Sequence, residues 1–444
     1  MRKKLTTIAG IMLTLSMSMI LGSCGNTPNS SEVTSQDNKL AAHEPVTLTF
    51  FSGTAGTMNE EQFTKYVQEP VQKKYPHITL KFVLSGKGTT INDLVASGET
   101  PDLITNGPAS IFTYSDLALT GDITPIANKL NFDFNRIEDA QLDFIRAYSN
   151  RNGLYSMPFM NGTIVLFYNK DIFDKFGVAY PKDLMTWDQI YDIAKKIVRT
   201  DAGVKYRSIE FFALNAYNQL SATYVNPSTK KASFNTQSWK TLFETFDKFY
   251  KIPGSEFITT TYADNEKAFL KDRNLAMFVS GFNNVFNGIS ASEETKKTFN
   301  WDMVTLPVFP DQPKLGATPI PNHIMITKTS KYQEDAFRVV ETVLSDEVQG
   351  MLSRGGIIPV LKKQSIKDEF LKEVDFAKGK NTGAVFKLDR APARIPSEYD
   401  GVVQGILNNL PKDIHSGKKD VNTALRDADD AANKAIEAEK AKSK

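Results

Sequence analysis

The segment from Val46 to Thr105 alternates between strand and helix patterns, and this alternation limits the chain to a small set of folds. Three stretches read as strands, and the two stretches between them read as helices. The strand patterns cover 46–50, 77–84 and 102–105, and the helix patterns cover 59–74 and 91–96. This order predicts an α/β layer with a parallel sheet. Binding sites of such sheets lie beyond the carboxyl ends of the strands, here in the loops 52–58, 85–90 and 106–110.

The remainder of the chain continues the mixed pattern. Thr186 and Gln189 have the spacing of a capping box, and apolar residues follow on one helical face up to Ile197. A strand pattern at 275–279 runs into Ser280-Gly281, and an alanine-rich helix pattern covers 421–439. At 444 residues, the length favours two domains over one.

The N-terminal segment differs in character from the rest. A basic start at Met1–Lys4 precedes Leu5–Leu21, a mostly apolar stretch that is too short and too rich in Thr and Ser for a stable membrane span. It ends in Leu21-Gly22-Ser23-Cys24, which resembles the lipobox of bacterial lipoproteins, and Cys24 is the only cysteine of the chain. We therefore expect residues 1–23 to be a lipoprotein signal peptide and Cys24 to be lipidated. An ordinary secretory signal is the alternative.

Residues 24–44 are rich in Asn, Ser, Thr and Gln and contain almost no bulky apolar side chain. Such a segment cannot bury a core, so we expect a flexible tether between the lipid and a folded body that begins near Pro45. The expected location of that body is the extracellular face of the cell membrane, held there by the lipid anchor.

Charge and cysteine content exclude several classes of protein. The formal charge of +2, from 53 Lys+Arg and 51 Asp+Glu, is too small for a nucleic-acid binder. One cysteine excludes an internal disulfide and a thiolate cluster, and the four histidines lie too far apart for an HExxH zinc site. The run Asn131–Asn135 lacks the glycine and the glutamate of a calcium loop. We expect no cofactor and no metal.

Several short runs, each weak alone, have an order and spacing that resemble one family. The runs are Ala96–Leu103, Leu154–Pro158, Leu166–Phe173, Thr186–Asp188, Ala276–Phe282 and Arg394–Tyr399. Together they resemble the extracellular solute-binding proteins, family 1, which are the sugar-binding lipoproteins of ATP-binding-cassette (ABC) importers. The resemblance extends over 46–436, and Ile395 interrupts the pattern of the last run.

The resemblance implies an α/β fold of two lobes, like the periplasmic binding proteins that close as a Venus flytrap about a hinge. It implies a first lobe of 45–157 with 316–361, and a second lobe of 158–315 with 362–444. It also implies a monomer that captures a saccharide, an oligosaccharide in particular, and delivers it to ABC permease subunits in the membrane. No catalytic step is expected.

A sugar presents apolar C–H faces and a rim of hydroxyl groups, so its site needs aromatic rings and planar hydrogen-bonding groups. We expect these groups in the loops that face the cleft. The candidates are Ser52, Gly53, Asn106, Ser110, Asn161, Asn215, Tyr217, Gly281, Phe282, Asn283, Arg354, Arg394 and Tyr399. The alternative for Phe282 is a place in the lobe core, and the alternative for Arg394 is a structural ion pair. Trp187, Trp239 and Trp301 are expected in the core.

Two other functions stay open at this point. An exported glycoside hydrolase or lyase needs two carboxylates at a defined separation across a cleft, and the many Asp and Glu residues decide nothing. No run resembles a hydrolase signature, and no GxSxG elbow is present. A binding protein for ferric iron, a polyamine or a peptide is the other alternative. The mostly neutral candidates, with Arg354 and Arg394, favour a neutral or mildly acidic saccharide.

Overall fold

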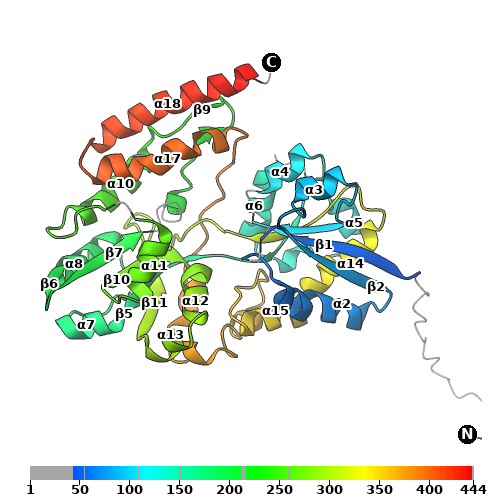
Figure 1. Cartoon of the computed structure of the whole chain (residues 1–444), viewed down its shortest axis with the longest axis horizontal. Coiled ribbons are helices and arrows are strands. Elements are labelled where there is room, and N and C mark those ends of the chain that lie inside the picture. The colour runs from blue at the N-terminus through cyan, green and yellow to red at the C-terminus, as the bar shows by residue number, and fades with distance from the viewer. Residues whose placement is uncertain are drawn as a thin grey trace, which may run out of the picture. The chain divides into compact units, whose positions relative to one another are not determined.

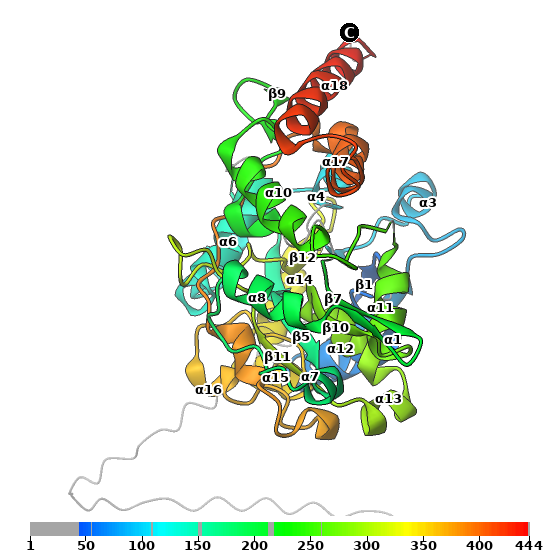
Figure 2. The ribbon, with the colours of Figure 1, turned by 90° about the vertical axis from the view of Figure 1, so that its left-hand side faces the viewer.

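Two five-stranded sheets organise the described part of the chain, and each forms the centre of one lobe (Figures 1 and 2). The computed structural model describes residues 44–54, 56–107, 110–149, 153–211, 217–258 and 260–442. Helices flank both sheets, so the two-lobed α/β architecture expected from the sequence is confirmed.

The first sheet has the strand order β2-β1-β3-β12-β4. Its strands are β1 (Val46–Ser52), β2 (Ile78–Leu84), β3 (Leu103–Asn106), β4 (Met157–Met160) and β12 (Asn322–Ile326). Strand β1 pairs in parallel with β2 and β3, as the alternation predicts. Strand β12 pairs antiparallel with β3 and β4, so a late segment of the chain completes the sheet.

Helices cover both faces of the first sheet. The helical elements of this lobe are α1 (Glu60–Phe63), η1 (Thr64–Gln68), α2 (Glu69–Lys74), α3 (Ile91–Ala96), α4 (Ser110–Asp116), α5 (Thr124–Lys129), η2 (Phe134–Arg136), α6 (Asp139–Tyr148), α14 (Gln333–Val343) and α15 (Asp346–Arg354). Capping boxes at Asn59 and Thr90 open the two helices predicted by the alternation, and the first of these contains the π-helical stretch η1. Neighbouring residues of β1 enter opposite cores, since Phe50 packs with Phe63 whereas Phe51 packs with Leu94.

The second sheet has the strand order β11-β5-β10-β7-β6. Its strands are β5 (Ile164–Asn169), β6 (Arg199–Asp201), β7 (Val204–Phe211), β10 (Leu275–Gly281) and β11 (Trp301–Thr305). Strand β10 pairs in parallel with β7 and antiparallel with β5, and β5 pairs antiparallel with β11. A separate ribbon pairs β8 (Val225–Asn226) with β9 (Lys231–Ala232).

The remaining helical elements begin with α7 and end with the long helix α18. They are α7 (Lys170–Phe176), α8 (Trp187–Ile197), η3 (Tyr217–Leu220), α10 (Gln237–Tyr250), α11 (Tyr262–Leu270), α12 (Phe282–Ser290), α13 (Glu293–Thr298), α16 (Gln364–Lys367), η4 (Asp375–Ala377), η5 (Thr382–Phe386), α17 (Asp400–His415) and α18 (Val421–Lys442). The capping box of α8 is confirmed, with reciprocal hydrogen bonds between Thr186 and Gln189. Helices α8 and α10 share one core with the sheet, and α11 and α12 share the other.

The three tryptophans lie in these cores, as expected. Trp187, Trp239 and Trp301 are at most 2% exposed. The Trp187 indole N–H donates to the side chain of Gln219 at 3.1 Å, and the Gln219 amide donates to the carbonyls of Pro307 and Leu315 at 2.9 Å. Gln219 therefore ties η3 to the connection between β11 and β12.

The segments that pass between the two sheets hydrogen-bond to one another. Residues 161–163 connect β4 to β5. The Asn161 N–H donates to the Ile358 carbonyl at 2.9 Å, and the Gly162 N–H donates to the Ile320 carbonyl at 3.0 Å. Three separate parts of the chain thus meet at the crossing. The lobe boundaries drawn from the family resemblance stay predictions.

The helices that were not predicted from the sequence include α6, α12 and α17. Each begins without a hydrogen bond from an N-cap side chain, at Glu138, Gly281 and Tyr399 respectively. These three helices therefore lack the kind of start signal that identified α8 in the sequence. Within the ranges described above, no helix is both long and apolar enough to cross a membrane.

Candidate functional site

One edge of the first sheet collects the ends of four strands, β1 to β4, and the start of a fifth, β12. Strands β1 and β3 run in parallel and end at Ser52 and Asn106. Strand β12 runs the opposite way, so its first residue, Asn322, lies at this same edge, paired with Met160 at the end of β4. Carboxyl ends of parallel strands are the usual place for a binding site in an α/β sheet.

The second sheet has a corresponding edge. Strand β10 ends at Gly281, which pairs with Ile164 at the start of β5. Strand β11 ends at Thr305, opposite Val165. Strand β7 ends at Phe211, opposite Val279.

The crossing brings the two edges together. It leaves β4 at Met160 and enters β5 at Ile164, so these two ends are no more than about 15 Å apart. The Phe282 N–H donates to the Thr163 carbonyl at 2.8 Å, which fixes the end of β10 against the crossing. The topology therefore sets the two edges on either side of one narrow region.

At the first edge, Ser52 and Gly53 shape the backbone. Ser52 is fully buried, and its Oγ lies 3.0 Å from the Thr54 carbonyl oxygen and 2.9 Å from the Met58 carbonyl oxygen. A Cβ on Gly53 would stand 2.1 Å from Asn106 Nδ2, so only glycine leaves room for the Asn106 side chain. Both residues hold the loop and offer no free side-chain group.

Asn106 is half-buried and locked in place at this edge. Its Nδ2 donates to the Tyr114 hydroxyl at 2.9 Å, and its Oδ1 accepts from the Gly107 N–H at 2.8 Å. Ser110 Oγ donates to the Gly107 carbonyl at 2.6 Å. The second N–H of the Asn106 amide remains a pre-oriented donor. Asn322, a half-buried amide that the sequence analysis missed, starts β12 at the same edge.

His323 supports this arrangement from beneath. It is fully buried, and its Nε2 donates to the Gly107 carbonyl at 3.2 Å. Burial lowers the pKa of His323 to about 4, because the charged imidazolium would lose its hydration. The ring is therefore neutral at physiological pH.

At the second edge, Phe282 belongs to the core. It is 0% exposed, and its ring centroid lies 5.0 Å from that of Phe286 and 5.4 Å from that of Phe370. Protein covers its ring, so it offers no free face to a sugar, and the core alternative applies. Asn283, the next residue, is partly exposed, as is Gly281.

The two candidate arginines are engaged in ion pairs. Arg354 Nε lies 2.7 Å from Glu373 Oε1, and Arg354 Nη1 lies 3.7 Å from Glu369 Oε2. The pair clamps the segment after α16 onto the end of α15.

Arg394 forms a buried ion pair with Asp400, and its guanidinium lies 3.9 Å from the centre of the Tyr224 ring. Tyr399 packs against the second-lobe core. Arg394 is therefore a structural ion-pair residue in this conformation, which is the alternative stated above.

Three candidates give no information on the site. Cys24 and Asn215 fall outside the described residues, and Tyr217 is described only through the backbone of η3.

Asn161 lies in the crossing and is 4% exposed, and its backbone N–H donates to the Ile358 carbonyl.

An aromatic group missed by the sequence analysis lies beside the first edge. Phe112 follows Ser110 in α4 and is half-buried. Its ring centroid lies 5.6 Å from that of Tyr148, which in turn stacks on Phe144 at 4.7 Å. Its position in the sequence could have indicated this place. Phe112 is the third residue of α4, the helix that follows the loop after β3.

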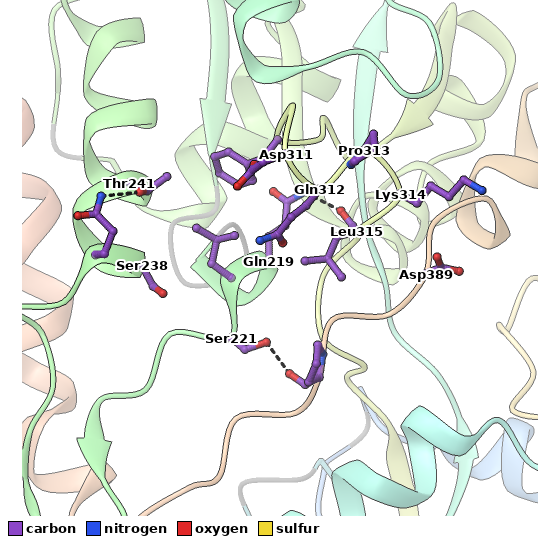
Figure 3. Close-up of a pocket in the computed structure, with 14 residues that line it drawn as sticks. Gln219, Ser221, Ser238, Thr241, Asp311, Gln312, Pro313, Lys314, Leu315 and Asp389 are labelled. Atoms are coloured by element: carbon purple, nitrogen blue, oxygen red, sulfur yellow. Dashed lines mark hydrogen bonds between the residues drawn. The ribbon is translucent and has the colours of Figure 1, made fainter.

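A cavity of about 820 Å³ opens beyond the ends of β7 and β11 (Figure 3). Its lining includes the apolar residues Leu220, Phe309 and Leu315 and the polar residues Ser238, Gln312 and Asp389. Ser221 Oγ closes one side by donating to the Pro392 carbonyl at 2.6 Å. This cavity is a second place where a polar ligand with apolar faces would fit.

The described residues contain no group of three or more His, Cys, Asp or Glu side chains able to hold a metal ion.

Comparison with known proteins gives a consistent picture. Residues 56–350 match the family described as bacterial extracellular solute-binding protein. An arabinooligosaccharide-binding protein of Bacillus subtilis (strain 168) is 26% identical over 252 residues, which is 54% of this chain and 53% of that relative. The chain thus matches about half the length of this relative. A putative binding protein of Brucella abortus (strain 2308) is 22% identical over 86% of this chain and 90% of its own length.

Solved structures share the fold. An ABC substrate-binding protein of Listeria monocytogenes, in complex with cycloalternan, has a TM-score of 0.67 at 20% identity, over 88% of this chain and 99% of that one. UgpB of Mycobacterium tuberculosis, in complex with glycerophosphocholine, has a TM-score of 0.67 at 14% identity, over 89% and 99% of the two chains. At these identities the likeness concerns the fold alone.

Proposed function

We propose a function for this chain from one premise, which is that it belongs to the bacterial extracellular solute-binding protein family. The chain captures a saccharide, an oligosaccharide in particular, between the facing edges of its two sheets and releases it unaltered. The proposal rests above all on the short crossing, which sets the amides of Asn106 and Asn322 opposite the second sheet.

The chemistry of the first edge supports an uncharged polar ligand. Asn106 and Asn322 offer planar amides that match pairs of sugar hydroxyls, and Phe112 offers an aromatic ring for a C–H face. His323 is neutral, because burial lowers its pKa to about 4. Both arginines suggested by the sequence are already neutralised by carboxylates.

Binding and release follow from the two lobes. A ligand that contacts both edges stabilises a closed arrangement over an open one, and each tenfold preference for the closed form shifts the equilibrium by about 1.4 kcal/mol. The crossing segments are the hinge of this motion, with lobe boundaries as drawn from the family resemblance.

The N-terminal segment determines where the folded body acts. Residues 1–23 are the signal peptide, Cys24 carries the acyl chains, and residues 24–44 tether the body at the extracellular face of the cell membrane. The body acts as a monomer there, and tethering raises its effective concentration near the ABC permease subunits that accept the saccharide. A Cys24→Ala variant is expected to be released into the medium with its saccharide affinity unchanged.

A ligand screen tests the proposal. Thermal unfolding of the purified protein is measured with a panel of mono- and oligosaccharides, with glycerophosphocholine as the non-saccharide comparison. A true ligand at 100 times its dissociation constant adds about 2.7 kcal/mol to the stability. Recovery of that saccharide intact after incubation distinguishes binding from hydrolysis, and new reducing ends would instead indicate an exported glycan-degrading enzyme.

Matched variants locate the site. Asn106→Ala is expected to weaken saccharide binding, whereas Ser238→Ala, in the cavity of Figure 3, is expected to leave it unchanged. The opposite result would move the saccharide into that cavity. A stabilising effect of glycerophosphocholine alone would favour a non-sugar solute.

A further inference from the structure

A smaller cavity lies where the start of α6 meets the crossing and the chain after η5. Its volume is about 330 Å³. Its polar lining residues include Glu138 and Gln141 at the start of α6, Asn161 of the crossing, and Lys367, Asp389 and Arg390. Its walls therefore come from both sides of the crossing, and only Asn161 among them was a saccharide candidate.

Two amide side chains in this wall each have an oxygen without a hydrogen-bond partner among the described residues. Gln141 is 1% exposed and Asn161 is 4% exposed, and neither side-chain oxygen has a hydrogen-bond partner among the described residues. Buried amides are almost always satisfied by protein, water or a ligand. Because a half-turn of an amide exchanges its oxygen and its NH₂ group, each can also donate.

Arg390 adds a cation whose hydrogen-bond partners are neutral, and the Glu138 carboxylate of the same cavity is the charged group that acts on it. Arg390 donates to Thr163 Oγ1 and, at 3.2 Å, to the Val385 carbonyl. Its side chain keeps part of its surface exposed, yet the surrounding protein lowers its pKa to about 10, so it is charged at neutral pH. A guanidinium in such surroundings favours an anion with two oxygens that match its planar fork.

The acidic groups nearby are mostly compensated. Glu138 forms an ion pair with Lys367, and Asp139 forms one with Lys362 at 2.9 Å. Asp389 is exposed and also lines the larger cavity, so solvent screens its charge. In addition, α6 starts here without a side-chain cap, which leaves backbone N–H groups of its first turn as donors.

We infer that this cavity binds a small oxyanion, a carboxylate or a phosphate, held by the Arg390 guanidinium and by the amides of Gln141 and Asn161. The site is centred on Arg390 beside the crossing, and its test does not depend on the saccharide proposal. Its occupant contacts α6 on one side of the crossing and the 386–390 segment on the other.

Calorimetric titration with inorganic phosphate, and separately with acetate, tests this inference. The purified protein is used without saccharide and at constant ionic strength. Binding of phosphate, of acetate or of both is expected, and their relative affinities identify the source of the oxyanion. Arg390→Gln is expected to weaken binding at least tenfold. Arg390→Lys, which keeps the charge but loses the fork, is expected to give an intermediate loss.

Arg146→Gln is the matched control. Arg146 lies on α6, the helix that contributes Gln141 to the cavity, and it pairs with Asp143 at the surface. It is expected to leave the affinity unchanged. If Arg390→Gln does not fold, Gln141→Leu replaces it, with a loss of affinity expected again. Absence of binding by both anions, or equal affinity in the wild-type protein and the Arg390 variants, would overturn the inference. Saccharide binding is measured in a separate experiment, so a protein that binds no saccharide can still confirm the oxyanion site.

Discussion

A Ser-Gly pair stands at the end of both β1 and β10, yet the two strand ends are built differently. After Ser52-Gly53, a loop runs to the start of α1 at Glu60, and Gly53 makes room for the side chain of Asn106. After Ser280-Gly281, helix α12 begins at once with Phe282, which is 0% exposed.

The comparison shows that the distance from strand to helix decides what a sheet edge offers. A loop between them lets polar side chains of neighbouring strands reach the edge. A helix that starts directly after the strand turns its first residue back into the core, where an aromatic side chain adds packing instead of a ligand contact. In this molecule Asn106 and Asn322 lie at the first edge, whereas Phe282 after the second edge is buried in the core.

The largest expected effect comes from the second edge. Phe282→Ala should lower the free energy of unfolding by about 3–5 kcal/mol, because it opens a cavity within the phenylalanine stack. Denaturant unfolding followed by tryptophan fluorescence measures this loss. Phe282→Leu, which keeps most of the volume, should lose less. Unchanged stability together with lost saccharide binding would instead make Phe282 a stacking platform and break the comparison.

The next effect is a pH dependence of the free energy of unfolding that is expected to differ between the two lobes. The pKa of His323 is about 4 in the folded chain and 6.5 in the unfolded chain. Above pH 6.5 the residue is therefore neutral in both states and does not make the free energy of unfolding depend on pH. As the pH falls from 6.5 to 4, the unfolded chain binds a proton that the folded chain cannot, and about 3 kcal/mol of stability is lost. His323→Gln should flatten this dependence, measured as unfolding free energy against pH.

His415, buried in the second lobe, is the control for that experiment. Burial lowers the pKa of His415 as well, but Asp247 at 3.1 Å offsets part of this effect. His415→Gln should therefore flatten the pH dependence less than His323→Gln does. The reverse order would place the acid-sensitive step in the second lobe.

A smaller effect tests the polar groups of the two edges directly. Asn106→Ala should weaken saccharide binding about tenfold, which is the value of one good hydrogen bond. Asn283→Ala, at the second edge, should weaken it less, because the second edge offers fewer polar groups. Calorimetric titration of both variants with the same saccharide decides between them, and equal losses would make the edges equivalent.

The smallest effect concerns Arg354, which the sequence suggested as a ligand contact. Arg354→Gln should change the unfolding free energy by at most about 1 kcal/mol, because its ion pairs with Glu369 and Glu373 are partly exposed. Saccharide affinity should not change. A loss of affinity in the folded variant would return Arg354 to the site.

Local signals explain how much of the fold could be predicted. Helices α3 and α8 have capping boxes at Thr90 and Thr186, and the sequence located both. Helices α6 and α12 start without a side-chain cap, and the sequence missed them. Missing α12 also affected the prediction for Phe282, since a residue expected in a loop is in fact the buried first residue of a helix.

The site was harder to predict because it depends on pairing between distant segments. Asn106 follows a recognisable strand, so its place at the edge could be expected. Asn322 reaches that edge only because β12 runs antiparallel, and no local pattern in the sequence gives that direction. The ion pair between Arg394 and Asp400 likewise depends on how α17 packs.

A crystal structure of the protein with the saccharide identified by the ligand screen tests the central claim most directly. An intact saccharide is expected between the two sheets, in contact with the amides of Asn106 or Asn322 on one side and with the second lobe on the other. A saccharide bound only in the cavity lined by Ser238 and Gln312, or one found cleaved, would contradict it.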